Sequence, residues 1–263
     1  MVSSSDKYTS MILNIVESYQ GKEQLEFIES FCDFVLDRSF IEFQNEEDIF
    51  AVFNDYMREL CSNIKYYDRE IIKEYTGTLF RDVNAVLRNN WDYEMNGRCT
   101  KEREKDALEI ANDMQEIFYN SGSYLPADIK VYRGVSISAF KKFGVRKLED
   151  LVFLKGQYVF DSGFTSTSII RGRSFFDRSL GFHDTCNIEI EYLVPIESND
   201  GLPLITNSLT YSPVQTEFLI NKGSLSKIVD VDIIDGKAYI KAIHIPQRVW
   251  DKRLDAHLSR RKK

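Results

Sequence analysis

Three short segments carry side chains that could act on a nucleotide. Arg133 follows the apolar run 129–132, residues 165–168 read Thr-Ser-Thr-Ser, and Glu217 comes two residues after Gln215. A guanidinium group makes permanently charged, bidentate contacts with phosphates. A carboxylate stabilises the oxocarbenium ion that forms when a glycosidic bond breaks, and hydroxyl groups can hold that carboxylate. In this order, the segments fit cleavage of a bond such as the one joining nicotinamide to ribose in NAD.

Each segment taken alone also has an ordinary structural interpretation. The run 129–132 predicts a strand with Arg133 at its edge, and an isolated arginine there would be a surface residue. Ser166 and Ser168 are expected to share one strand face, because residues two apart point the same way. Gly134 would let a ligand approach the backbone closely. The functional interpretation depends on all three segments occurring in order, each beside an expected strand.

The first half of the chain has helical periodicity. Apolar residues recur at i, i+3, i+4 and i+7 over 107–118, and similar stripes run over 25–35 and 49–56. The Asn-Ser-Gly sequence at 120–122 suits a helix C-cap. Pro126 marks the change of character that follows, so we expect helices up to this point.

Strand patterns dominate after residue 129. Apolar and polar residues alternate over 186–192, as in a strand with one wet face. Two strand-like runs within 231–242 flank Asp235-Gly236, a sequence typical of a tight β-hairpin turn. The pattern predicts an α+β protein, with a helical N-terminal part and a largely antiparallel β part.

The ordered trio resembles the arginine–serine–glutamate signature of bacterial mono-ADP-ribosyltransferases. This family includes clostridial Rho-inactivating exoenzymes and the catalytic domains of actin-modifying binary toxins. Residues 155–168 are similar to the family's approach to its Ser-Thr-Ser strand, and 71–88 resemble a helical signature of its N-terminal region. The likeness covers about 68–223. It implies an ADP-ribosyltransferase-like fold with a mainly antiparallel two-sheet β core, NAD+ as co-substrate and no metal.

The resemblance assigns catalytic roles residue by residue. It implies that Arg133 binds the NAD phosphates and that the backbone at Gly134 holds the nicotinamide carboxamide. Ser166 would position Glu217. Glu217 would form a hydrogen bond with the nicotinamide ribose and stabilise the oxocarbenium ion.

The same likeness implies further contacts with NAD. Thr167 and Ser168 belong to the strand that borders the co-substrate. Family members usually follow this strand with an aromatic that stacks on nicotinamide and an arginine for phosphate. Phe175 and Arg178 have the family's Phe-x-x-Arg spacing, whereas Phe182 lies nearer the next expected strand and has no arginine three residues later. Both phenylalanines are candidates, and core packing is the alternative for each.

The residue two before the candidate catalytic glutamate bears on the acceptor. Arginine-modifying members have glutamate there, but Gln215 cannot act as a base, although its amide donates and accepts hydrogen bonds. The likeness therefore implies a non-arginine acceptor: asparagine, glutamine or threonine on a protein, or a nucleobase. Tyr211 is the candidate aromatic for target recognition. It lies one residue further from Glu217 than the family spacing, and Pro213 is expected to reshape the intervening turn.

Hydrophobic content and charge indicate which class of protein this is and which partners it favours. The chain has 263 residues, 43% of them hydrophobic, which is typical of a globular protein. The net charge is −7, although residues 248–263 hold seven Lys or Arg against two Asp. The acidic body argues against a protein that coats nucleic acid and favours a protein as the macromolecular acceptor. The basic tail has three interpretations: a solvated end, a nucleic-acid contact or a targeting signal.

Cysteine and histidine spacing indicates neither a metal site nor a disulfide framework. Four cysteines are far apart and three histidines form no ligand spacing with them, so we expect no structural zinc and a reducing compartment. The apolar run 11–16 is too short for a secretory signal, and no run approaches the roughly 20 residues of a membrane helix. We expect a cytoplasmic protein, or one delivered into a host cell without a Sec-type signal.

These patterns predict three parts: a helical extension over 1–67, a catalytic domain over 68–246 whose helical lobe ends near 122, and a basic tail over 247–263. An antitoxin or a chaperone is a candidate partner of the N-terminal helices. The favoured hypothesis is a toxin or effector that transfers ADP-ribose to an Asn or Gln side chain of a protein. Alternatives are the same transfer to RNA or DNA, and an inactive fold relative that only binds a partner.

Overall fold

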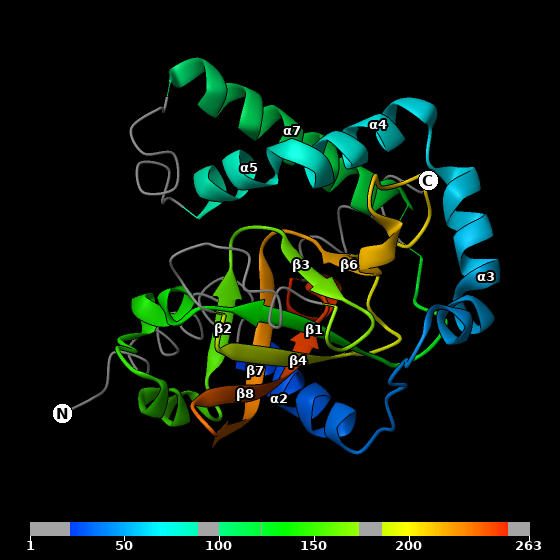
Figure 1. The fold of residues 1–263 in the computed structure, drawn as a ribbon. Helices are drawn as coiled ribbons and strands as arrows, with labels where there is room; N and C mark the ends of the chain where they lie inside the picture. Colours follow the sequence, from blue (N-terminus) through cyan, green and yellow to red (C-terminus); the bar gives the residue numbers. More distant parts are fainter. Residues whose placement is uncertain (1–21, 89–99, 122, 174–185, 252–263) are drawn as a thin grey trace.

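Most helices precede the strands along the chain (Figure 1). The computed structural model describes residues 22–88, 100–121, 123–173 and 186–251. The α-helices are α2 (Lys22–Leu36), α3 (Glu46–Asn63), α4 (Tyr66–Glu74), α5 (Phe80–Leu87), α7 (Lys101–Ser121) and α8 (Gln247–Trp250). The other helical turns are a π-helix, η1 (Tyr75–Leu79), and three 3-10 helices, η2 (Ile137–Phe143), η3 (Leu148–Leu154) and η4 (Pro213–Gln215). The strands are β1 (Ile129–Val135), β2 (Tyr158–Asp161), β3 (Thr165–Ser168), β4 (Ile188–Val194), β5 (Gly201–Leu204), β6 (Glu217–Ile220), β7 (Ser224–Ile234) and β8 (Lys237–Ile245).

Within the described residues, eight strands form one sheet in the order β2-β7-β8-β4-β1-β3-β6-β5. Every neighbouring pair is antiparallel except β4 and β8. The groups β2-β7-β8-β4-β1 and β3-β6-β5 meet through one registered pair, Tyr132 with Ser168. The α+β class is confirmed, and the expected two-sheet core takes the form of two strand groups joined at this pair.

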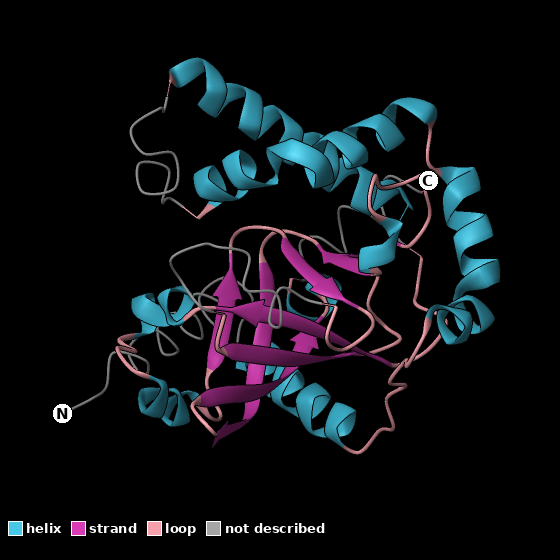
Figure 2. Cartoon of the chain, in the orientation of Figure 1, coloured by secondary structure: helices cyan, strands magenta, loops and turns pink. Residues whose placement is uncertain are grey.

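Helices cover both faces of the sheet. Figure 2 shows α4, α5 and α7 as a layer on one side, whereas α2 lies against the other side. The helical layer packs on the β3-β6-β5 group through one core cluster that includes Met114, Phe164 and Phe218. Helix α2 buries Ile28 and Cys32 in a separate cluster with residues of β7 and β8. The sheet therefore has an apolar core on each side, and the helical layer stands above the strands that carry the candidate site.

Local patterns in the sequence correspond closely to these elements. Helix α7 buries the apolar stripe of 107–118, and the stripes at 25–35 and 49–56 lie in α2 and α3. Asp235 and Gly236 have φ angles of 51° and 73°, the left-handed pair that a tight hairpin between β7 and β8 needs. Periodicity and turn chemistry therefore predicted these elements without knowledge of their packing.

Helix α3 packs into the same core as the candidate catalytic strands. Asn45 caps the helix by accepting from the Asp48 backbone N–H at 2.9 Å. Ile49 and Phe53 are fully buried in the cluster that also contains Phe218 of β6. The start of α3 is thus anchored in the same apolar core as β6. The domain boundary expected between residues 67 and 68 stays a prediction.

Candidate active site

Glu217 is the first residue of β6, and its carboxylate is held from the neighbouring strand β3. Ser168 lies opposite Glu217 in the antiparallel pair, so Ser166 is a diagonal neighbour within reach of a long side chain. The Ser166 Oγ donates to Glu217 Oε1 at 2.5 Å. Burial raises the pKa of Glu217 above that of an exposed glutamate, and the bond from Ser166 partly offsets this rise. Strand register therefore fixes one carboxylate oxygen in a half-buried position.

The turn before Glu217 is held by the end of β3. Pro213 opens the 3-10 turn, and Thr216 has a φ of 47°, a conformation that β-branched residues rarely adopt. Ser168 Oγ donates to the Gln215 carbonyl at 3.1 Å, and the Ile169 N–H donates to the Thr216 carbonyl at 2.9 Å. Such backbone strain persists only where the surroundings hold it. The turn that carries Gln215 is therefore a defined structure, and it begins at Pro213.

Arg133 lies inside β1, and the expectation that it ends a strand is wrong. The strand continues because Gly134 and Val135 pair with Glu189 and Ile188 of β4. The apolar run 129–132 gave no sign of this continuation, which depends on a partner strand more than fifty residues later. Arg133 consequently projects from a central strand of the sheet, where its backbone position is well fixed.

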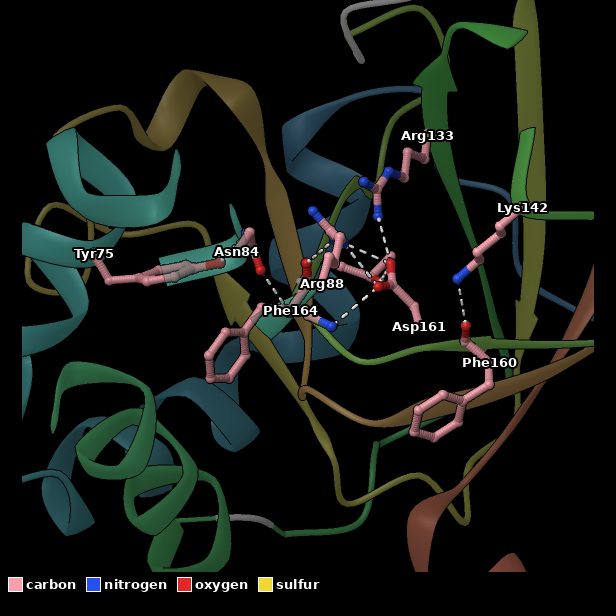
Figure 3. A network of polar contacts seen from close by, with 10 residues as sticks. Tyr75, Asn84, Arg88, Arg133, Lys142, Phe160, Asp161 and Phe164 are labelled. Carbon is pink, nitrogen blue, oxygen red and sulfur yellow. Dashed lines mark hydrogen bonds and ion pairs between the residues drawn. The ribbon is translucent and has the colours of Figure 1, made fainter. Parts of the chain in front are cut away.

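A carboxylate connects Arg133 to a second arginine (Figure 3). Arg88, at the end of α5, donates from Nε and Nη2 to the two oxygens of Asp161 at 2.8 and 3.0 Å, and from Nη2 to the Phe164 carbonyl at 2.9 Å. Arg133 Nη1 lies 3.7 Å from Asp161 Oδ2. Burial alone would raise the pKa of Asp161, but the positive charge and hydrogen bonds of Arg88, aided by Arg133, lower it to about 2. Two guanidinium groups are thereby held around one ionised carboxylate.

The helical layer docks beside these arginines through a contact that needs glycine. Asn84 donates from Nδ2 to the Tyr75 hydroxyl at 3.0 Å and accepts from the Phe164 N–H at 2.8 Å. The rings of Tyr75 and Phe164 meet edge to face with centroids 5.1 Å apart. A Cβ atom on Gly163 would lie 2.6 Å from Asn84 Oδ1 and 2.9 Å from Arg88 Cζ. The absent side chain at Gly163 is what allows the helices to approach the sheet here.

Glu217 and the two arginines, Arg88 and Arg133, border one cleft of about 530 Å³ between the helical layer and the sheet, a usual size for a small-molecule site. Its described lining includes eight residues that the sequence singled out: Arg133, Gly134, Ser166, Thr167, Ser168, Tyr211, Gln215 and Glu217. Thr167 Oγ1 donates to the Phe218 carbonyl at 2.6 Å, so this hydroxyl bonds the neighbouring strand. The candidates Phe175, Arg178 and Phe182 lie outside the described residues.

The wall of the cleft that the helical layer forms contributes residues to which the sequence assigned no role. Tyr75, Asn84 and Arg88 all line the cleft and all lie within 71–88, the segment whose likeness to a family signature marked it as more than an ordinary helix. Nothing in the local pattern of that segment indicates that Arg88 pairs with Asp161. Their separation of 73 residues makes the pairing a property of the tertiary structure.

The described part of the chain contains no cluster of three or more His, Cys, Asp or Glu side chains arranged to hold a metal ion. Among the described residues, none of the helices is both long and apolar enough to cross a membrane.

The chain belongs to the ADP-ribosyltransferase exoenzyme family, whose model matches residues 53–245. It is therefore an enzyme that uses NAD+ as co-substrate for ADP-ribosyl transfer, in a family of bacterial toxins. No curated protein sequence matches the chain.

Solved structures show the same fold at low sequence identity. A protein of S. aureus, solved with NAD, is 17% identical, with a TM-score of 0.60 over 80% of this chain and 100% of that chain. The Clostridium limosum C3 exoenzyme is 18% identical, with a TM-score of 0.59 over 79% of this chain and 98% of that chain. An ADP-ribosyltransferase of Clostridium botulinum is 20% identical, with a TM-score of 0.61 over 79% of this chain and 99% of that chain. These structures confirm the ADP-ribosyltransferase-like fold.

Proposed function

We propose that this enzyme transfers ADP-ribose from NAD+ to an Asn or Gln side chain of a target protein, with release of nicotinamide. The observation that carries the proposal is the 2.5 Å bond from Ser166 to Glu217, in the same cleft as Arg133 and Gln215. This arrangement places a fixed carboxylate, a guanidinium group and an amide around one space. These groups support the proposed roles in cleavage, phosphate binding and acceptor contact.

The cleft offers a fitting environment for NAD+. Arg133 and Arg88 supply positive charge for the pyrophosphate, and Asp161 keeps the two guanidinium groups close together. The backbone at Gly134 lines the cleft and is the proposed contact of the nicotinamide carboxamide. Phe175 and Arg178 stay candidates for stacking on nicotinamide and for a further phosphate contact, with Phe182 the alternative aromatic.

Glu217 is the proposed catalytic carboxylate. When the bond between ribose C1′ and nicotinamide breaks, its electron pair leaves with nicotinamide and positive charge develops on the ribose. An ionised carboxylate beside that ribose stabilises the transition state more than the ground state, because the ring charge increases along the reaction. Ser166 holds Glu217 before the reaction, so little reorganisation is needed. The acceptor nitrogen then forms the new bond to C1′ and releases its proton to water, while nicotinamide leaves as the neutral molecule.

Gln215 and Tyr211 are the proposed contacts of the acceptor. Gln215 lies two residues from Glu217, and its amide can both donate to and accept from an acceptor amide. Tyr211 is 66% exposed, yet its ring packs beside Gly77, where an added Cβ would lie 3.3 Å from Tyr211 Cδ2. Lys73 Nζ lies 5.9 Å from the centre of the Tyr211 ring. The aromatic thus stands at the mouth of the cleft with one side supported and much of its surface available to a target.

The acceptor class is tested by incubating the protein with labelled NAD+ and a cell extract, then treating portions with protease or nuclease. We expect label that protease removes and nuclease leaves. Label removed by nuclease alone would refute a protein acceptor. We expect Glu217→Gln to abolish both transfer and nicotinamide release while its circular dichroism spectrum and melting temperature stay those of the wild type. Retained activity in this variant would show that Glu217 is misassigned.

The role of Gln215 is tested separately. We expect Gln215→Ala to lose transfer but keep much of the NAD+ hydrolysis, since water needs no amide to reach the oxocarbenium ion. Val214→Ala is the matched control, because this neighbouring residue lines a different groove and not the cleft that contains Gln215. Equal loss of transfer and hydrolysis in Gln215→Ala would refute an acceptor role.

A further inference from the structure

Arg173 bridges two segments that are distant in the sequence. Its Nη1 donates to Glu46 Oε1 at 2.5 Å and to the Val214 carbonyl at 2.9 Å. Glu46 is the first residue of α3, and Val214, 67% exposed, is in the turn that carries Gln215. One guanidinium group therefore ties an exposed turn to the start of a helix whose next turn is buried in the core.

The bond to Val214 acts on the backbone that orients Gln215. The Val214 carbonyl and the Gln215 N–H belong to the same planar peptide group, which moves as a unit. Arg173 holds the oxygen of this group, and the Gln215 N–H donates to the Ser212 carbonyl at 3.0 Å. The peptide group that follows is held by Ser168 Oγ, which donates to the Gln215 carbonyl at 3.1 Å. Both peptide groups that flank the Gln215 Cα are thus fixed, and with them the direction in which its side chain leaves the backbone.

The two contacts that hold the Gln215 turn, one from Ser168 and one from Arg173 with Glu46, come from different parts of the chain. Ser168 belongs to β3 and to the Ser-Thr-Ser signature, so its contact is part of the strand that also bears Ser166. Glu46 lies before residue 53, where the match to the family model begins. The side chains of Arg173 and Glu46 are 34% and 46% exposed, so their ion pair should contribute little to the stability of the folded protein. Its main effect is to fix the local geometry of the turn.

We propose that Arg173 and Glu46 are positioning residues that aim Gln215 at the acceptor, and that this pair governs ADP-ribose transfer more than NAD+ cleavage. The inference rests on the proposed function, in which Gln215 contacts the acceptor and Glu217 serves cleavage. Glu46 acts only through the guanidinium group of Arg173. Release of the Val214 carbonyl lets the peptide group rotate and misdirects the glutamine, whereas the bond between Ser166 and Glu217 stays in place.

The test compares Arg173→Gln and Glu46→Ala in the full chain. Rates of labelled ADP-ribose transfer to extract protein and of NAD+ hydrolysis without extract are measured together. We expect the ratio of transfer to hydrolysis to fall about tenfold in Arg173→Gln, the effect of losing one charge-assisted hydrogen bond. A fall of about threefold is expected in Glu46→Ala, which leaves the guanidinium group present. Glu47→Ala is the control for charge at the helix start, because Glu47 is exposed in the same turn; its ratio should stay that of the wild type.

Two further measurements separate positioning from a general structural effect. The double variant should lose no more than Arg173→Gln alone, because Glu46 acts through Arg173. Arg173→Lys should recover part of the ratio, since an ammonium group can still donate to the Val214 carbonyl. Equal falls in transfer and hydrolysis, an unchanged ratio, or additive losses in the double variant would overturn the proposal.

Hydrogen exchange of the Gln215 backbone N–H can be measured without any acceptor, so it tests the positioning pair independently of transfer. We expect this amide to exchange faster in Arg173→Gln and in Glu46→Ala than in the wild type and in Glu47→Ala. If the wild type releases nicotinamide but labels no protein, the proposed function fails, and the exchange rates alone decide on the positioning pair. Unchanged exchange in Arg173→Gln would overturn the inference even if transfer is confirmed.

Discussion

Asp161→Asn is the substitution whose effect on stability can be worked out most directly from the structure. Asp161 accepts two hydrogen bonds from Arg88 and lies 3.7 Å from Arg133. Its pKa in the folded protein is about 2, against about 3.9 for an aspartate in an unfolded chain. A difference of this size corresponds to roughly 2 to 3 kcal/mol of folding stability at neutral pH. The Asn variant keeps the size of the side chain but loses this contribution, so its free energy of unfolding at pH 7 should fall by about that amount.

The stability lost in Asp161→Asn should depend on pH in a predictable direction. Because the folded pKa of Asp161 is depressed, the carboxylate stabilises the protein fully above the unfolded pKa and loses its effect as the pH falls through the folded pKa. The stability gap between the wild type and Asp161→Asn should therefore be constant above about pH 5 and close between about pH 4 and pH 2. Urea unfolding followed by circular dichroism at several pH values measures the gap directly.

Asp230→Asn is the matched control. Asp230 Oδ1 lies 2.7 Å from Lys155 Nζ, but both side chains are about half exposed, so solvent screens the pair and its contribution to stability should be much smaller than that of Asp161. The reasoning would be refuted if both substitutions cost the same, if Asp161→Asn were as stable as the wild type at pH 7, or if its stability gap did not change on acidification.

Further predictions concern the carboxylate and the contact between helices and sheet. Ser166→Ala should move the acidic limb of kcat/KM for NAD+ hydrolysis to higher pH, because the serine bond lowers the pKa of Glu217 and the reaction needs the ionised form; an acidic limb at unchanged pH would argue against this role. Gly163→Ala should destabilise the protein by about 1 to 3 kcal/mol in urea unfolding, because its Cβ would overlap Asn84 Oδ1. A variant as stable as the wild type would contradict the close approach. Tyr75→Phe should cost about 1 kcal/mol by leaving the Asn84 amide without its partner oxygen, and no loss in thermal or urea unfolding would show that this bond is dispensable.

Much of the fold follows from local sequence. The apolar stripe of 107–118 requires one buried helix face, and Asp235-Gly236 supplies the two left-handed residues of a tight hairpin. These features involve residues close in sequence, so their preferences can be read without knowing the partners. The parallel pairing of β4 with β8 leaves no comparable local signal, because either direction of pairing would bury the same apolar faces.

The site divides in a similar way. Gln215 and Glu217 could be singled out because residue type and spacing alone define their chemistry. The positions of Arg88 and Asp161 could not be predicted as a pair, since the docking of α5 on the sheet brings them together. Arg133 was expected at a strand end, and only the register of β1 with β4 shows that the strand continues past it.

Residue types and their spacing define which chemical groups this protein has, their order along the chain and the local elements that carry them. Tertiary packing brings Ser166 to Glu217, places Asp161 between two arginines, and lets Arg173 connect the Gln215 turn to α3. The physical reason is that strand register and helix docking are set by the summed burial and hydrogen bonding of distant segments. No local window of sequence contains that sum.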